Sequence, residues 1–138
     1  MIKILIVEDD LRQNQVLCNY LKNNHYEVTG CTNVNSALEV ISRSAIDIIV
    51  SDIMMPELDG FDLAEAIRTQ DKNIPILFAS ALDDMPSKQK GFRMGIDDYM
   101  VKPINLDELL LRLEALVRRA NIANMAVLSI GGGDPKSR

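Results

Sequence analysis

Short apolar runs alternate along the chain with longer segments in which apolar residues recur every three or four positions. The apolar runs cover residues 2–7, 26–31, 46–50, 76–79 and 98–101. The predicted helical segments cover residues 11–23, 35–43 and 60–69, a fourth segment ending near residue 94, and a fifth beginning near residue 106. This alternation predicts an α/β fold of the (βα)5 type, in which a doubly wound sheet of five parallel strands has right-handed crossovers and helices on both faces.

Residues at the segment ends support these bounds. Either Asn33 or Asn35 can cap the second helix. Pro86 is tolerated in the first turn of the fourth helix, and Gly95 ends that helix. The run at residues 26–31 is less apolar than the others, which predicts a strand at an edge of the sheet.

The third apolar run is almost continuous. Residues 46–50 are nearly all Ile or Val, which is typical of a strand that is covered on both faces. The run stops at Ser51 and Asp52, and Pro56 and Gly60 mark the loop that follows. Because ligands of open α/β sheets bind at the carboxyl ends of strands, Asp52 is a candidate functional residue.

Composition narrows the classes of function. The chain has 138 residues, enough for one domain, and a formal net charge of −5, which argues against binding of nucleic acid or an anionic membrane by this segment. Cys18 and Cys31 lack metal-binding spacing and are interpreted as buried thiols of a reducing compartment. His25 is the only histidine, so neither a zinc site nor a histidine-based triad is expected. The run at residues 2–7 is too short to span a membrane, and no signal-peptide cleavage region follows it, which predicts a cytoplasmic protein.

The composition changes near residue 121. Residues 121–138 are weakly apolar and end in a glycine-rich stretch that contains a proline. We therefore predict one domain over residues 1–120 and a linker or tail over residues 121–138, which leads toward an output domain absent from this sequence. For the last eight residues, a disordered or cloning-derived terminus is an equal alternative.

The predicted strand ends carry polar side chains suited to one kind of chemistry. In a parallel sheet, Glu8 and Asp9, Asp52, Ser80 and Lys102 meet at the carboxyl edge. Carboxylates a few ångströms apart repel by up to about 4 kcal/mol per pair, so the cluster requires protonation, a cation or a metal ion. An all-oxygen site of this size suits Mg²⁺ or Mn²⁺. With a lysine and a hydroxyl group beside it, the site has the groups needed for phosphoryl transfer to a carboxylate.

The motifs at these strand ends resemble the receiver domain of bacterial two-component response regulators. The resemblance covers about residues 2–120 and rests on the stretches Ile-Leu-Ile-Val-Glu8-Asp9-Asp10, Ser-Asp52-Ile-Met-Met-Pro56 with Asp59-Gly60, Pro75 with Ala79-Ser80-Ala81, and Asp97-Asp98-Tyr99-Met-Val-Lys102-Pro103. It implies a flavodoxin-like sheet with the strand order 2-1-3-4-5.

The resemblance also implies a role for each residue of the acidic cluster. Asp52 would be the phosphoacceptor, and Lys102 would pair with the phosphoryl group. Asp9, Asp52 and the backbone carbonyl of Met54 would bind Mg²⁺, and Glu8 would act through a water molecule. The domain would catalyse only its own phosphorylation and dephosphorylation, so it is not expected to be an enzyme with a separate substrate.

The switch that the resemblance implies is a population shift. A phosphoryl group on Asp52 would draw Ser80 inward, Tyr99 would turn in behind it, and the surface of the fourth helix, fifth strand and fifth helix would change. The peptide bond that precedes Pro103 would be cis, as a proline allows.

Some positions depart from the commonest pattern of the family. The switch hydroxyl belongs to Ser80 rather than to the more frequent Thr. Met54 and Leu82 are apolar and cannot orient an attacking water molecule, so we predict slow autodephosphorylation.

The chain lacks the histidine and nucleotide site of a kinase, so a sensor histidine kinase or a small phosphodonor must supply the phosphoryl group. The resemblance implies a homodimer on phosphorylation, formed through interspersed charges on the fourth helix, fifth strand and fifth helix: Lys88, Asp97, Asp98, Glu108, Arg112, Arg118 and Arg119. The end of the fifth helix at Arg119 is similar to that of the winged-helix DNA-binding class, which favours a transcription regulator that contacts DNA only through its missing C-terminal domain. The alternative is a single-domain receiver that carries phosphate in a relay or docks on a target protein.

Other classes of protein fit the motifs less well. A haloacid-dehalogenase-type phosphatase needs a second acid two residues after its nucleophile, where this chain has Met54. In a flavodoxin-like redox domain, the acidic stretch from Glu8 to Asp10 would repel the flavin phosphate. A degenerate receiver that never takes phosphate is disfavoured because all the site residues are present.

Overall fold

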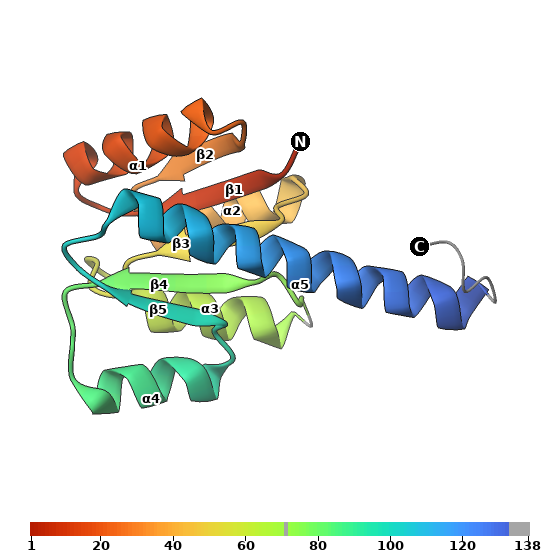
Figure 1. Ribbon diagram of the computed structural model, residues 1–138. Helices are drawn as coiled ribbons and strands as arrows, with labels where there is room; N and C mark the ends of the chain where they lie inside the picture. Colours follow the sequence, from red (N-terminus) through yellow and green to blue (C-terminus); the bar gives the residue numbers. More distant parts are fainter. Residues whose placement is uncertain (71, 133–138) are drawn as a thin grey trace.

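A central sheet of five parallel strands forms the core of the protein (Figure 1). The computed structural model describes residues 1–70 and 72–132. The elements are β1 (Lys3–Val7), α1 (Leu11–Asn23), β2 (Glu27–Cys31), α2 (Val34–Arg43), β3 (Ile48–Ser51), α3 (Gly60–Thr69), β4 (Ile76–Ser80), α4 (Met85–Met94), β5 (Asp98–Val101) and α5 (Leu106–Gly132). The strand order is β2-β1-β3-β4-β5, so the predicted fold, strand order and edge position of the second strand are confirmed.

Side-chain caps set where the helices begin. In each case an Asp or Asn accepts a hydrogen bond from the backbone N–H three residues later; these residues are Asp10, Asn33, Asp59, Asp84 and Asn105. Asn33, and not Asn35, therefore caps α2. Four of these caps lie two to four residues after a strand end, so those loops at the carboxyl edge of the sheet are short; the loop that ends at Asp59 is longer.

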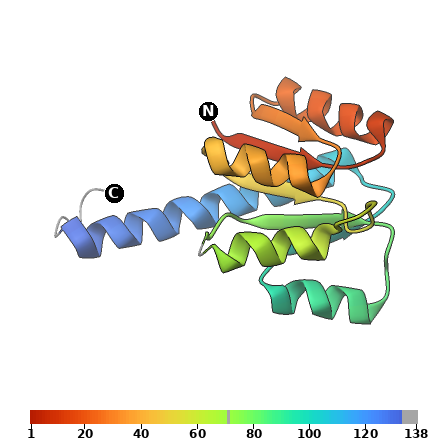
Figure 2. The ribbon, with the colours of Figure 1, turned by 180° about the vertical axis from the view of Figure 1, so that it is seen from behind.

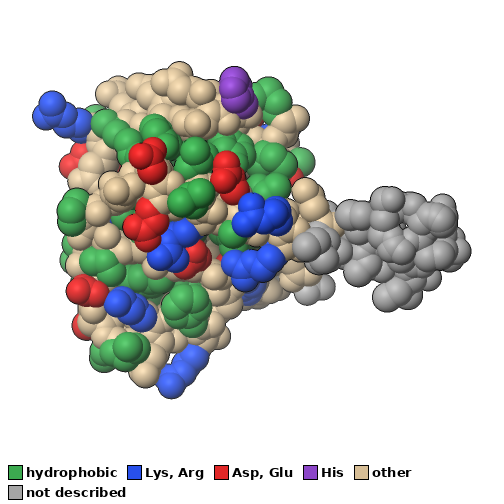
Figure 3. All heavy atoms as spheres, viewed as in Figure 1, with side chains coloured by type: hydrophobic (Ala, Val, Ile, Leu, Met, Phe, Trp, Pro, Cys, Tyr) green, Lys and Arg blue, Asp and Glu red, His purple; other side chains and the backbone are tan. Residues whose placement is uncertain are grey.

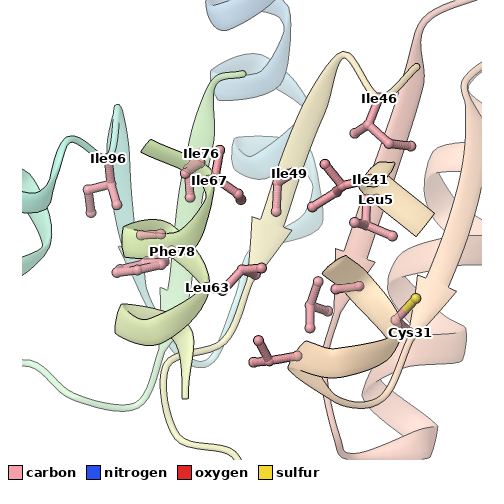
Figure 4. Close-up of a cluster of buried hydrophobic side chains, with 14 of the residues drawn as sticks. Leu5, Cys31, Ile41, Ile46, Ile49, Leu63, Ile67, Ile76, Phe78 and Ile96 are labelled. Carbon is pink, nitrogen blue, oxygen red and sulfur yellow. The ribbon is translucent and has the colours of Figure 1, made fainter. Parts of the chain in front are cut away.

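Two apolar layers cover the two faces of the sheet. On one face, residues of α1 and α5 pack on β1, β3 and β4. On the other face, α2 and α3 pack on the same sheet, as Figure 2 shows from behind and Figure 4 shows in detail. Phe78 is fully buried in this second layer, where its ring contacts Phe61 and Tyr99 edge to face at centroid distances of 5.7 and 6.3 Å.

Helix α4 has little apolar anchorage. Among its residues, Gly91 alone is buried. The Lys90 ammonium lies 4.3 Å from the Phe61 ring centroid, and that of Lys88 lies 5.9 Å from the Tyr99 ring centroid. Exposed cation–π contacts contribute only about 0.5–1 kcal/mol each, so α4 can shift at a smaller free-energy cost than the other helices.

Helix α5 continues through Gly132 and extends past the end of the sheet, into the segment from residue 121 that we predicted as a linker or tail (Figure 1). The segment has no proline before Pro135, so no residue in it blocks continuation of the helix. Residues 133–138 lie outside the described residues, and a following output domain stays a prediction.

Within the described part of the chain, no helix combines the length and the apolar character that crossing a membrane requires.

Candidate functional site

The carboxyl ends of four strands bring the predicted site residues together. Parallel register pairs Val7 with Ser51 and Ser80 with Val101. The ladder continues one residue further, because the N–H of Asp52 donates to the carbonyl of Val7 at 2.9 Å and the N–H of Lys102 donates to that of Ser80 at 2.8 Å. Strand β1 therefore ends level with β3, and β4 ends level with β5. Strand β4 runs two residues past β3, because Ser51 pairs with Phe78, and the residues that follow the four strands lie at one edge.

Lys102 bridges two buried carboxylates. Its Nζ lies 2.6 Å from Oε1 of Glu8 and 2.8 Å from Oδ2 of Asp52. Glu8 is 3% exposed and Asp52 is 8% exposed. The sequence predicted that repulsion in the cluster is relieved by protonation, a cation or a metal ion, and Lys102 is a cation in contact with two of the carboxylates. The Lys102–Pro103 peptide bond is cis, as expected.

The pKa values of Glu8 and Lys102 are both raised, for different reasons. Burial raises the pKa of Glu8, although the hydrogen bond from Lys102 partly offsets it. Burial would lower the pKa of Lys102, but its hydrogen bonds to Asp52 and Glu8 outweigh this effect, so its pKa is raised. Lys102 is therefore a stable cation at neutral pH.

The acidic residues form a cluster that suits a divalent metal ion. Glu8, Asp9 and Asp52 each place a carboxylate oxygen within 4.8 Å of the others, and the Asp9 side chain is exposed to solvent. The donors are all oxygen, as Mg²⁺ and Mn²⁺ prefer, and the exposed Asp9 leaves room for the water molecules that Mg²⁺ retains. The residues therefore fit the predicted metal. Met54, the predicted carbonyl ligand, lies in the loop after β3 with its side chain 60% exposed.

The loop between β3 and α3 folds back on Asp52. The N–H of Ile53 donates to Oδ1 of Asp52 at 2.6 Å, and the N–H of Gly60 donates to the carbonyl of Ile53 at 2.8 Å. A Cβ atom at Gly60 would collide with the backbone carbonyl of Asp52, so this close approach requires glycine. Asp59 and Asp62 complete a capping box that starts α3 at this point. This explains why the motif ends in Asp59-Gly60.

The predicted switch residues both contact the backbone of Leu82. The N–H of Leu82 donates to Oγ of Ser80 at 3.2 Å, and the hydroxyl of Tyr99 donates to the carbonyl of Leu82 at 2.6 Å. Ser80 is fully buried, and Tyr99 is 9% exposed. Burial raises the pKa of Tyr99, which keeps its hydroxyl protonated as a donor. Ser80 and Tyr99 are thus linked through Leu82.

Most of the charged residues predicted for the dimer face are paired within the chain. The pairs are Lys88 with Asp83 at 2.9 Å, Asp97 with Arg68 at 3.2 Å, Arg112 with Asp98 at 2.9 Å, and Arg112 with Glu108 at 2.8 Å. Arg118 and Arg119 are exposed on α5. In Figure 3, which looks onto α5, acidic and basic side chains are interspersed with apolar ones.

Sequence reasoning missed two polar side chains that hold loops in place. Asn14 is buried and bonds to the carbonyl groups of Glu8 and Cys31. The guanidinium of Arg68 bonds to backbone carbonyls at the far end of the sheet, including that of Gly95 at 2.8 Å. Asn14 was detectable, because it stands three residues before Leu17 at an inward position of α1, where an apolar residue is expected.

A groove of about 600 Å³ lies next to the cluster, between α1 and the loop that follows β5. Its lining is mainly apolar and reaches Lys102 at one end; the other lining residues are Arg12, Gln13, Val16, Leu17, Pro103, Ile104 and Leu106. Val16 is 48% exposed, so an apolar surface is open to a partner beside Asp52.

The sequence matches a known protein family and is similar to a longer protein. The family described as the response regulator receiver domain matches residues 4–114. The heme response regulator HssR of Staphylococcus aureus is 34% identical over 131 residues, which cover 95% of this chain and 58% of HssR. The chain therefore spans little more than half the length of this relative.

Two solved structures are also similar to this chain in sequence and in fold. The receiver domain of the Francisella response regulator 1452 is 36% identical, with a TM-score of 0.83 over 87% of this chain and 99% of that one. The chemotaxis protein CheY4 of Vibrio cholerae is 32% identical, with a TM-score of 0.81 over 84% of this chain and 98% of that one.

Proposed function

Because the chain belongs to the response regulator receiver domain family, we propose that it is a phosphorylation-dependent signalling switch that carries the phosphoryl group on Asp52. One observation carries the proposal: Asp52 is buried at the sheet edge, 2.8 Å from the ammonium of Lys102 and beside Glu8 and Asp9. A buried carboxylate that faces both a cation and an all-oxygen metal site is suited to accept a phosphoryl group. The donor would be a sensor histidine kinase.

In the proposed reaction, a carboxylate oxygen of Asp52 attacks phosphorus. A P–O bond forms as the P–N bond to the donor histidine breaks, and the nitrogen retains the bonding electrons. Lys102 is placed to pair with the incoming phosphoryl oxygens, since its Nζ already lies 2.8 Å from Asp52. Asp9 and Asp52, with Glu8 through water, would hold Mg²⁺, which would offset the charge of the phosphoryl oxygens.

The groove beside Lys102 supports docking of the kinase at this edge. Its apolar lining includes Val16 and Ile104, and it lies between α1 and the β5–α5 loop. A helical partner could bury its apolar face there and bring a phosphohistidine to Asp52.

The contacts of Leu82 suggest how phosphorylation of Asp52 would change the position of α4. If Ser80 turned its hydroxyl toward a phosphoryl oxygen, the N–H of Leu82 would lose its acceptor and the loop would move. The carbonyl of Leu82 holds the Tyr99 hydroxyl, and the Tyr99 ring lies under the ammonium of Lys88 in α4. A shift at Ser80 would thus reach the weakly anchored α4 and change the face formed by α4, β5 and α5.

The proposed output is control of transcription. Phosphorylated copies would pair through the α4–β5–α5 face, and DNA would be contacted by a domain beyond this chain. The exposed Arg118 and Arg119, and a relative of which this chain covers only 58%, support this assignment over a single-domain carrier.

The direct test is intact mass spectrometry after incubation with acetyl phosphate and Mg²⁺. The wild type should gain one phosphoryl group, whereas Asp52→Ala, or the wild type without Mg²⁺, should gain none. Asp59→Asn is a matched control in the same loop, because Asn caps a helix as well as Asp and the gain should persist. Phosphorylation of Asp52→Ala at the wild-type level, or no gain by the wild type with acetyl phosphate or phosphoramidate, would refute the proposal.

A further inference from the structure

We propose that Asn14 is a positioning residue for the metal site, and that its carboxamide fixes the loop that presents Asp9. The inference rests on the proposed function only in so far as the acidic cluster binds a divalent metal ion. Asn14 is 8% exposed, and its Nδ2 group is hydrogen-bonded to two backbone carbonyls, so we do not assign it as a ligand of the metal ion. It would act through the backbone of the acidic loop.

Almost all the hydrogen-bonding groups of the Asn14 carboxamide have a partner. Its Nδ2 donates to the carbonyl of Glu8 at 2.9 Å and to the carbonyl of Cys31 at 2.8 Å. Its Oδ1 accepts a hydrogen bond from the thiol of Cys18 at 3.4 Å. The N–H of Glu8 also donates to the carbonyl of Cys31, at 3.0 Å. Asn14 thus ties the first residue after β1 to the end of β2.

This tie fixes the peptide that carries Asp9. The carbonyl group of Glu8 belongs to the Glu8–Asp9 peptide unit, so holding its oxygen sets the plane from which the Asp9 side chain projects. The Asp9 carboxylate itself is exposed, and its position depends on the backbone below it. Removing a group that orients a metal ligand commonly weakens metal binding about 10- to 100-fold.

Close packing around the carboxamide restricts it further. A Cβ atom at Gly30 would lie 2.5 Å from Oδ1 of Asn14 and 2.9 Å from Sγ of Cys18. Gly30 is on the edge strand β2 and is exposed, so an alanine there would meet no other obstacle than this pair. Because both side chains are buried and hydrogen-bonded, they cannot move aside without loosening the tie to Glu8. Gly30→Ala is therefore a second way to displace Asn14, without altering its chemistry.

The variants are Asn14→Leu and Gly30→Ala, with Leu17→Ala as the matched control. Asn14→Leu keeps a side chain of similar size but leaves the Glu8 carbonyl without its donor. Leu17 lies on the same buried side of α1 and packs in the apolar layer, so its truncation lowers stability without removing a bond to the acidic loop. Thermal unfolding of all three variants shows whether each is folded at the temperature of the binding assay.

The experiment measures binding of Mn²⁺ to the full chain from the free-ion signal in electron paramagnetic resonance, with competition by Mg²⁺. Asn14→Leu should raise the Kd for Mn²⁺ about tenfold or more. Gly30→Ala should also raise this Kd. Leu17→Ala should lower the melting temperature at least as much as Asn14→Leu and leave the Kd within about twofold of the wild type. A Kd unchanged in both Asn14→Leu and Gly30→Ala, or raised equally in Leu17→Ala, would overturn the inference.

The assay needs no phosphodonor, so its result is separate from that of the phosphorylation test. A wild type that binds Mn²⁺ but takes no phosphoryl group would refute the proposed function and leave the Asn14 result valid. A wild type that binds no Mn²⁺ would overturn the inference about Asn14.

Discussion

Replacing Lys102 with methionine should destabilise the fold by an amount that depends on pH. The substitution removes the ammonium that Glu8 and Asp52 share at 2.6 and 2.8 Å and keeps an unbranched side chain of similar length. The two carboxylates have oxygens within 4.8 Å of each other, so their repulsion is about 3.5 kcal/mol at an effective dielectric constant near 20. That agrees with the roughly 3–5 kcal/mol typical of removing one partner of a buried ion pair.

The pH dependence follows from Glu8. Burial already raises its pKa, and loss of Lys102 removes the hydrogen bond that lowers it. A group whose pKa is raised in the folded state binds its proton more strongly there than in the unfolded chain. Its contribution to stability is therefore complete below the unfolded pKa and is lost as the pH rises through the folded pKa. Lys102→Met should be closest to wild-type stability below the unfolded pKa of Glu8 and fall furthest behind once the pH has risen through its raised folded pKa.

The assay is urea unfolding followed by far-ultraviolet circular dichroism, because the chain has no tryptophan. Wild type, Lys102→Met and the double variant Glu8→Gln/Lys102→Met are compared in the presence of EDTA. The double variant should recover most of the loss at high pH, because one of the two repelling charges is gone. An equal loss for Lys102→Met at both ends of the pH range, with no recovery in the double variant, would show that Lys102 stabilises through packing and would refute the electrostatic reasoning.

Further predictions concern the loops around the site. Tyr99→Phe removes the hydroxyl that donates to Leu82 and should lower the free energy of unfolding by about 1 kcal/mol in urea, with the ring packing retained; no loss would contradict a hydrogen bond at this position. Glu57 has a φ of 68°, a left-handed conformation that costs a residue with a Cβ atom about 1 kcal/mol, so Glu57→Gly should raise the melting temperature and Glu57→Ala should not. Because Met54 and Leu82 offer no polar side chain to orient water, radiolabel on the phosphorylated protein should decay slowly, and a half-life of seconds would show this expectation to be wrong.

The fold could be predicted because its signals are local. Each buried strand is a short run of β-branched or other apolar residues, and each helix start is marked by an Asp or Asn cap. The site followed from the same argument, since the carboxyl ends of parallel strands lie at one edge of the sheet. Asp52 and Lys102, which are 50 positions apart in sequence, lie at that edge and are joined by a 2.8 Å contact.

Features that depend on tertiary contacts could not be predicted from the sequence. Arg68 bonds to carbonyls at Lys72 and Ile74 and, 27 residues away, at Gly95, and no local pattern distinguishes such an arginine from an exposed one at a helix end. The far end of α5 had no clear local signal, because residues 121–132 mix strong and weak helix formers, and the helix continues through Gly132.

The charges on the α4–β5–α5 face cannot by themselves supply the affinity of a homodimer. Arg112 already pairs with Asp98 at 2.9 Å and with Glu108 at 2.8 Å inside one chain. Exposed ion pairs contribute about 0–1 kcal/mol, and exchanging one for an equivalent pair across an interface changes the free energy by less. Phe92 on α4 and Leu111 on α5 remain 49% and 65% exposed, and full burial of such a side chain contributes about 1.5–3 kcal/mol. Pairing through this face would therefore draw its affinity from apolar contacts, whose alignment depends on the position of α4, while the ion pairs would set register and partner choice.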